Sequence, residues 1–201
     1  MKNTMVKDAL ILTVITVIAG LALGFVYEIT KAPIADQEYK SQQAAYAAVF
    51  EDAASFEEYA DFDADEAQTA IGDLASQNTI DSVMVALDES GETLGYVITV
   101  SDSAGYGGTV TFSTGITLDG TMNGISFTTL NETAGLGMKA KEEAFSSQFQ
   151  GVTSQSLEVV KTTPSEGQIK AISGATITSS AVTSGANAAL TYFYNVLGGG
   201  Q

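Results

Sequence analysis

Residues 173–176, Ser-Gly-Ala-Thr, offer the clearest chemistry in the sequence, because they place hydroxyl groups directly before the amphipathic run at residues 178–197. The first turn of a helix leaves backbone N–H groups unpaired and carries about half a positive charge from the helix dipole. Such a turn binds an anion without a basic side chain, so a phosphate would be stabilised beside Thr176. Taken alone, the same residues also fit a plain turn with an ordinary N-cap at Thr176, Thr178 or Ser179.

The composition excludes most other chemistry. The chain has no Cys and no His, which excludes disulfides, thiolate nucleophiles, iron–sulfur clusters, most zinc sites and the commonest base at neutral pH. A redox function would therefore need an organic cofactor. The net charge of −16, with only 8 cationic residues, all of them Lys, argues against nucleic acid as a partner.

Two further runs of small residues could bring backbone N–H groups to the same ligand. They are residues 105–108, Gly-Tyr-Gly-Gly, and residues 132–137, Glu-Thr-Ala-Gly-Leu-Gly. Glycine lets the backbone approach a flat, phosphorylated ligand closely. Each run alone is also compatible with a simple turn, and Tyr106 could stack on a ring or be an ordinary half-buried aromatic.

Residues 9–27 carry no charge and are rich in Leu, Ile, Val and Ala. As a helix they would be about 28 Å long, close to the hydrocarbon thickness of a bilayer, so we expect a transmembrane helix. A cleavable signal peptide is the alternative, because residues 22–24 resemble a small-x-small cleavage site. Lysines flank both ends of the span equally, so their distribution does not set the orientation. We expect residues 1–8 to remain in the cytoplasm as a short tail and the long acidic part of the chain to be exported.

Residues 28–80 predict a stalk with a helix at 42–50, followed by an acidic region of helices and loops. Asp61, Asp63 and Asp65 in this region have the alternate spacing found at the start of a calcium-binding loop. Glu66 and Gly72 stand where that loop needs Gly and a bidentate Glu. Solvated helix faces and loops therefore explain the acidic residues better.

Residues 81–201 predict an α+β domain. Period-two alternation indicates strands, and the Asp-Gly pair at 119–120 suits a tight hairpin. Helical spacing predicts helices over 139–149 and 178–197, the latter stopped by a run of three glycines. We expect these helices to pack on one side of an antiparallel sheet. The expected strands are residues 84–87, 93–100, 109–112, 116–118, 122–130 and 157–160.

The order of five features in this chain resembles that of a known family. The features are the expected span, the segment Thr-Lys-Ala-Pro-Ile at 30–34, the two Gly-rich loops and Ser-Gly-Ala-Thr-Ile-Thr at 173–178. The family is the FMN-binding subunit of ion-pumping membrane redox complexes: the G subunit of the Rnf complex and its relative, the C subunit of the sodium-pumping quinone reductase. The resemblance covers nearly the whole chain. It implies a single-pass electron carrier of the cell membrane with an extracytoplasmic FMN-binding domain.

The resemblance also implies covalent FMN, joined through its phosphate to the hydroxyl of Thr176 by a flavin transferase that uses FAD. Two residues depart from the family pattern. Lys170 stands six positions before the acceptor, where an acidic residue is common, and Ala134 stands where the family loop usually has Pro. Neither departure removes the hydroxyl.

With the neighbouring loops, the resemblance gives an expected cofactor-binding set and neither a catalytic residue nor a metal ligand. The set is Thr176 as the covalent FMN acceptor, with Ser173, Gly174, Ala175, Thr178, Glu132, Thr133, Gly135, Leu136, Gly137 and Tyr106.

The implied partners are the membrane, the flavin transferase and other membrane subunits of the complex, against which Gly20 and Gly24 would let the span pack closely. Two alternatives stay open. One is a stand-alone membrane-anchored extracellular flavoprotein with the same linkage. The other is a non-redox acidic surface binding module, in which the three loops are merely turns.

Overall fold

The computed structural model describes residues 2–198 and divides the chain into two compact units, residues 1–42 and 43–201. The expected boundary between residues 80 and 81 does not coincide with this division. Residues 43–80 belong to the second unit, because they supply a helix end, a strand and two short helices that pack on its sheet. Met1 and residues 199–201, which hold part of the expected glycine stop, lie outside the described residues.

The first unit is the greater part of one continuous helix, α1 (Lys2–Val49), which also includes most of the helix expected at 42–50. Its large apolar side chains from Met5 to Ile34 are exposed, and the helix is long and apolar enough to cross a membrane. Thr13 and Thr16 donate their hydroxyls to the carbonyls of residues 9 and 12, at 2.9 and 3.0 Å. These bonds satisfy the only polar side-chain groups between residues 9 and 26, as a lipid environment requires.

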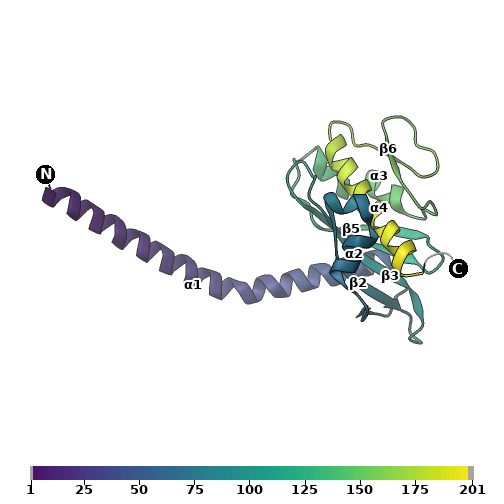
Figure 1. The fold of residues 1–201 in the computed structure, drawn as a ribbon, viewed down its shortest axis with the longest axis horizontal. Coiled ribbons are helices and arrows are strands. Elements are labelled where there is room, and N and C mark those ends of the chain that lie inside the picture. The colour runs from purple at the N-terminus through teal and green to yellow at the C-terminus, as the bar shows by residue number, and fades with distance from the viewer. Residues whose placement is uncertain (1, 199–201) are drawn as a thin grey trace. The chain divides into compact units, whose positions relative to one another are not determined.

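The second unit is built on a five-stranded antiparallel sheet in which each strand pairs with the next along the chain (Figure 1). The strands are β1 (Ser55–Glu58), β2 (Asn78–Leu87), β3 (Thr93–Asp102), β4 (Val110–Thr117) and β5 (Met122–Thr129). This arrangement confirms the predicted antiparallel sheet, in which strands that are neighbours in the sequence are also neighbours in space.

The two short strands expected at 109–112 and 116–118 form the single strand β4. Ser113 and Thr114 interrupt the apolar pattern, and both are completely buried. The Ser113 hydroxyl lies 3.0 Å from the hydroxyl of Thr99, and Thr114 donates to the carbonyl of Gly124 at 2.8 Å. Because these bonds satisfy the buried hydroxyls, the strand continues through them.

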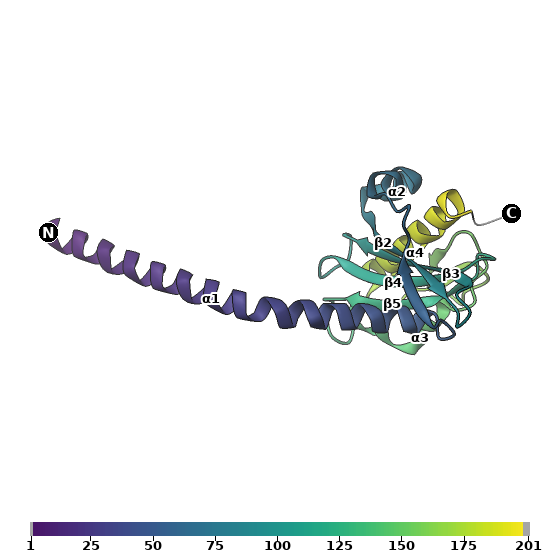
Figure 2. The same ribbon diagram turned by 90° about the horizontal axis from the view of Figure 1, so that it is seen from below.

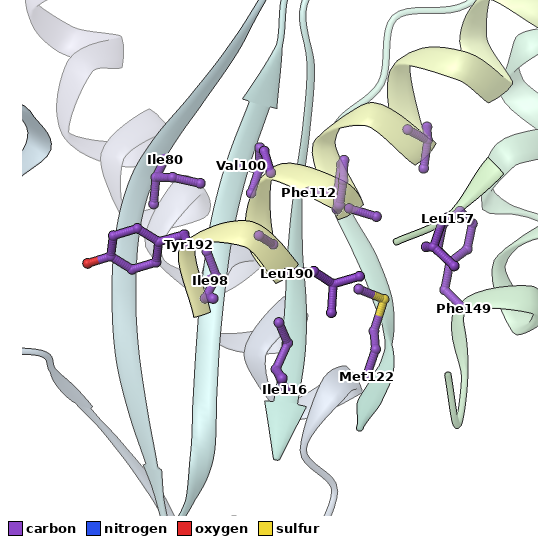
Figure 3. Close-up of a cluster of buried hydrophobic side chains, with 14 of the residues drawn as sticks. Ile80, Ile98, Val100, Phe112, Ile116, Met122, Phe149, Leu157, Leu190 and Tyr192 are labelled. Atoms are coloured by element: carbon purple, nitrogen blue, oxygen red, sulfur yellow. The ribbon is translucent and has the colours of Figure 1, made fainter. Parts of the chain in front are cut away.

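One face of the sheet is covered by α4 (Thr176–Val196) and, beside it, by α2 (Ala64–Ala70) (Figure 2). Apolar side chains of α4, among them Leu190, meet Ile98 and Phe112 of the sheet in the core (Figure 3). The helix begins two residues before the expected start. It ends just before Gly198, which adopts φ +84°.

The opposite face of the sheet is covered by the end of α1, whereas the two segments expected as helices, 139–149 and 178–197, share the core on the α4 side, as expected. Tyr46 and Val49 at the end of α1, with Phe50, pack on the opposite face against β2 and β3. Gly115 makes room for them, since a Cβ at this position would lie 2.6 Å from the Val49 carbonyl and 2.9 Å from the Phe50 ring. The absence of a side chain at Gly115 therefore leaves the space in which the end of α1 packs on the sheet.

The expected helix at 139–149 is a series of short turns instead: η2 (Gly137–Lys141), α3 (Glu143–Ser146) and η3 (Ser147–Phe149). Two short parallel strands follow, β6 (Glu158–Val160), close to the expected strand at 157–160, and β7 (Gln168–Lys170), which was not expected. The last strand leads directly into residues 173–176.

Asp63, one of the alternately spaced aspartates, caps α2 by accepting from the N–H of Glu66 at 2.8 Å.

Two buried polar side chains lie at one cross-strand position of β2 and β3, next to Ser184 of α4. Asp102 and its cross-strand neighbour Asn78 are both fully buried. Among the described residues, Oδ2 of Asp102 and Oδ1 of Asn78 have no hydrogen-bond partner. Burial raises the pKa of Asp102, while hydrogen bonds from the Ala104 N–H and the Ser184 hydroxyl oppose the shift.

Asp102→Asn should therefore stabilise the domain near neutral pH. Because the pKa of Asp102 is raised in the folded state, its stabilising contribution is complete below the usual aspartate pKa of about 4 and is lost as pH rises through the raised pKa. Asparagine carries no charge, so its burial has no cost of desolvating a carboxylate. We expect a higher melting temperature at pH 7–8 and a flatter dependence of melting temperature on pH.

The control is Asp81→Asn. Partial desolvation of its carboxyl also raises the pKa of Asp81, but the residue keeps contact with solvent and accepts a hydrogen bond from Ser101, so the effect of the substitution should be smaller. An Asp102→Asn protein that is less stable than the original at every pH would contradict the prediction.

Candidate functional site

A pocket of about 500 Å³ lies where three loops of the second unit meet the start of α4. The loops are the β3–β4 connection, the segment after β5 and the segment after β7. Most of the expected site residues line it, but Ser173 and Gly135 do not. The lining residues are Tyr106, Glu132, Thr133, Leu136, Gly137, Gly174, Ala175, Thr176, Ile177 and Thr178.

The first loop, residues 105–108, lies directly against the second. A Cβ on Gly107 would collide with the carbonyl of Asn131, and one on Gly105 would lie 3.1 Å from Oε1 of Glu132. These glycines therefore permit the close approach of two backbone segments. Tyr106, between them, is 71% exposed and lines the mouth of the pocket.

The second loop makes a tight turn closed by the Leu136 N–H, which donates to the carbonyl of Thr133 at 3.1 Å. Gly135 supplies the positive φ of +76° that a type II turn needs at its third residue. Ala134 occupies the second position of this turn, where proline is favoured because its fixed φ suits the turn. The loop conformation therefore does not depend on the missing proline.

Beyond this turn, Gly137 packs against two other parts of the site. A Cβ there would lie 2.6 Å from Oγ1 of Thr178 and 2.7 Å from Oε2 of Glu132. Oε1 of Glu132 is buried and has no hydrogen-bond partner in the part of the chain that the structure describes. A ligand group with an N–H or O–H donor would satisfy this oxygen.

The third loop turns sharply over residues 172–175 and delivers Thr176 as the first residue of α4. The Ala175 N–H donates to the carbonyl of Ile172 at 3.0 Å, and Gly174 adopts φ +79°. Ala175 occupies the N-cap position and makes no side-chain cap. The Thr176 side chain is exposed at the edge of the pocket.

Two other hydroxyls near the start of this helix, those of Thr178 and Ser179, are buried. Thr178 is 1% exposed, and Ser179 is completely buried with its hydroxyl already hydrogen-bonded to Ile172 and Ala175. Ser179 is therefore neither an N-cap nor available to a phosphate, contrary to one of the alternatives considered from the sequence. Of the hydroxyls of Thr176, Thr178 and Ser179, only that of Thr176 is exposed.

The helix dipole favours an anion at the start of α4, while Glu132 is the one charged side chain among the described residues that line the pocket. Its first backbone bond within the helix runs from the Ser179 N–H to the Ala175 carbonyl, at 3.0 Å, so the N–H groups of residues 176–178 precede the helical ladder. None of the described residues lining the pocket is a lysine. Lys170, in β7, is exposed and outside the pocket, with its backbone held by the side chain of Gln148. The helix N-terminus is thus the source of positive potential.

Ile177 lines the pocket and was not expected from the sequence. It is 54% exposed, although large apolar side chains of α4 are otherwise mostly buried. The sequence could have indicated this, because Ile177 lies outside the row of apolar residues that helical spacing places on the buried face of α4. Thr176 and Ile177 also line a second, smaller pocket of about 230 Å³, together with residues that include Gln77 and Ser180.

Comparisons with known proteins agree with this arrangement of segments. The model of the FMN-binding domain family matches residues 105–191, which include all three loops. The model of the RnfG N-terminal region matches residues 1–49.

The chain is 36% identical over 193 residues to the G subunit of the Na(+)-translocating ferredoxin:NAD(+) oxidoreductase complex of Acetobacterium woodii, covering 94% of this chain and 92% of that protein. It is 30% identical over 190 residues to the G subunit of the proton-translocating ferredoxin:NAD(+) oxidoreductase complex of Clostridium ljungdahlii, covering 94% and 91%. A solved structure, the C subunit of the Na(+)-translocating NADH-quinone reductase of Parabacteroides distasonis, shares 26% identity over 59% of this chain and 63% of that chain, with a TM-score of 0.49.

The family resemblance seen in the motifs is thereby confirmed over almost the full length of the chain. The chain belongs to the RnfG family, the G subunits of ion-translocating ferredoxin:NAD(+) oxidoreductase complexes.

Proposed function

We propose that this chain is the electron-carrier subunit of a membrane-bound ion-translocating redox complex of the Rnf type, with FMN attached to Thr176 through a phosphoester. Family membership and the FMN-binding domain match support the role and the cofactor. The single observation that supports the linkage is the exposed Thr176 hydroxyl, at a helix N-terminus and on the edge of a pocket of about 500 Å³. That volume lies in the usual range for ligand sites.

The residues of the pocket fit a flavin phosphate. The N–H groups of residues 176–178 and the dipole of the 21-residue α4 stabilise a phosphate on Thr176. Leu136 and Ile177, 42% and 54% exposed, offer apolar surface to a flat ring. Oε1 of Glu132 offers an unused acceptor to a ring N–H or a ribityl hydroxyl.

FMN, when bound, supplies one-electron chemistry that the protein side chains cannot provide. The chain's own residues position the cofactor and limit its contact with water. During attachment, Thr176 loses its hydroxyl proton to a base of the transferase and its oxygen bonds to the FMN phosphorus of FAD, while AMP leaves with the electron pair of the broken P–O bond. Ser173 and Gly174 are exposed, so the approach to this hydroxyl is open.

The first unit serves as the membrane anchor in this proposal. Residues 9–27 cross the membrane, residues 1–8 remain in the cytoplasm, and the FMN-binding domain is extracytoplasmic. A Cβ at Gly20 or Gly24 would meet no atom within 4 Å, so this face of α1 is free for a helix of another membrane subunit.

The deciding experiment is to purify the full chain in mild detergent from a host with its flavin transferase and the other subunits, and then to denature it on a gel. We expect a band with yellow-green flavin fluorescence and a mass increase equal to one FMN. A dark band from the native host would overturn the linkage. Copurification of other membrane proteins is expected, and their absence would favour the stand-alone flavoprotein instead.

A further inference from the structure

The turn that presents Thr176 is closed by one buried hydroxyl. Oγ of Ser179 accepts a hydrogen bond from the N–H of Ile172 at 2.9 Å and donates one to the carbonyl of Ala175 at 2.9 Å. Ile172 and Ala175 are the first and last residues of the turn. A single side chain therefore connects both ends of the turn to the first turn of α4.

These two bonds differ from ordinary hydrogen bonding of serine in a helix, in which the hydroxyl only donates to the carbonyl four residues earlier. Thr183, one turn further along α4, shows that ordinary pattern by donating to the Ser179 carbonyl at 2.9 Å. Both side chains are buried, at 0% and 2% exposure. Unlike the Thr183 hydroxyl as the structure describes it, the Ser179 hydroxyl also accepts a hydrogen bond, from the N–H of Ile172 in the turn.

The turn needs such a connection because its own residues restrict it weakly. Ser173 and Gly174 are exposed, and glycine has the largest conformational freedom of any residue. The turn has one internal backbone bond, from the Ala175 N–H to the Ile172 carbonyl at 3.0 Å. Without Ser179, the backbone N–H of Ile172 would lose its partner inside the protein.

We propose that Ser179 is a positioning residue for flavin attachment. It holds residues 172–175 so that the Thr176 hydroxyl has one orientation when the transferase binds, and it acts through the turn without touching the flavin. This inference rests on the proposed attachment at Thr176. A fixed acceptor accelerates a bimolecular transfer because its orientation does not have to be found during the reaction.

The test compares Ser179→Ala with the matched control Thr183→Ala in the full chain. Thr183→Ala removes one buried hydroxyl with its helix back-bond and one methyl group, whereas Ser179→Ala removes a buried hydroxyl that makes two bonds, so both melting temperatures should fall. In the protein without flavin, the Ile172 amide should exchange with solvent about tenfold faster in Ser179→Ala only, as expected for the loss of one hydrogen bond.

With purified transferase and FAD, the kcat for flavin attachment should fall about tenfold in Ser179→Ala and stay near the original value in Thr183→Ala. This readout separates positioning from simple destabilisation, since partial unfolding lowers the concentration of competent acceptor and raises KM without lowering kcat. Equal kcat values in both variants, or an Ile172 amide that stays protected in Ser179→Ala, would overturn the role of Ser179. If the original chain accepts no flavin, the proposed linkage fails, and the role of Ser179 fails with it.

Discussion

Thr176→Ala should remove covalent flavin completely while leaving the domain folded. The Thr176 side chain is exposed at the first position of α4, so its loss should change the free energy of unfolding by no more than about 0.5 kcal/mol. The phosphoester cannot form without the hydroxyl oxygen. Denaturing gels should therefore show a dark band of normal abundance, and the intact mass should lack FMN.

The matched control is Thr178→Val, which removes the other threonine hydroxyl at the start of α4 that lines the pocket. Thr178 is 1% exposed and packed against Gly137, so its hydroxyl is out of reach of a transferase, and this variant should remain fluorescent. Fluorescence in Thr176→Ala together with its loss in Thr178→Val would move the attachment to Thr178. That result would also require the first turn of α4 to open during the reaction.

Gly137→Ala should disrupt the pocket from within. The new methyl group would lie 2.6 Å from Oγ1 of Thr178 and 2.7 Å from both Cβ and Oε2 of Glu132, closer than atoms approach in folded proteins. Relieving this overlap requires the second loop to change its own conformation around Glu132 and the Thr178 side chain to shift. We expect a loss of about 1–3 kcal/mol in the free energy of unfolding and poor flavin incorporation, measured by urea denaturation and by flavin content per chain.

Gly135→Ala provides the control within the same loop. A Cβ there meets no atom within 4 Å, but the φ of +76° strains an alanine by about 1 kcal/mol. This variant should be slightly destabilised and should still incorporate flavin. The prediction fails if Gly135→Ala impairs flavin incorporation as much as Gly137→Ala does.

Much of the fold follows from local sequence patterns. The strands β3 and β5, the last part of β2 and the helix α4 were predicted from local residue patterns, and the strands pair with neighbours that are close in the sequence. The segments that local patterns describe poorly depend on distant contacts.

Two of these segments show the reason. In β1, three of the four side chains are exposed, and the strand is recognisable only through its pairing with β2. The end of α1 covers the second face of the sheet because Gly115 leaves space for Val49 and Phe50. The spacing of glycines and the residue types around Gly115 do not predict that the end of α1 packs there, because this contact joins segments far apart in the sequence.

The sequence by itself determined the chemistry that is available to this protein. It has an uncharged stretch long enough for a bilayer, no thiol or imidazole, and a Ser-Gly-Ala-Thr run before a helix, and these features depend only on composition and on neighbouring residues. The tertiary structure alone decided that residues 105–108, 132–137 and 173–178 meet around one pocket, since their proximity follows from strand register and helix packing. It also decided that Thr176 is exposed whereas Thr178 and Ser179 are buried, because the contacts that cover those two hydroxyls come from Gly137 and from the turn at residues 172–175.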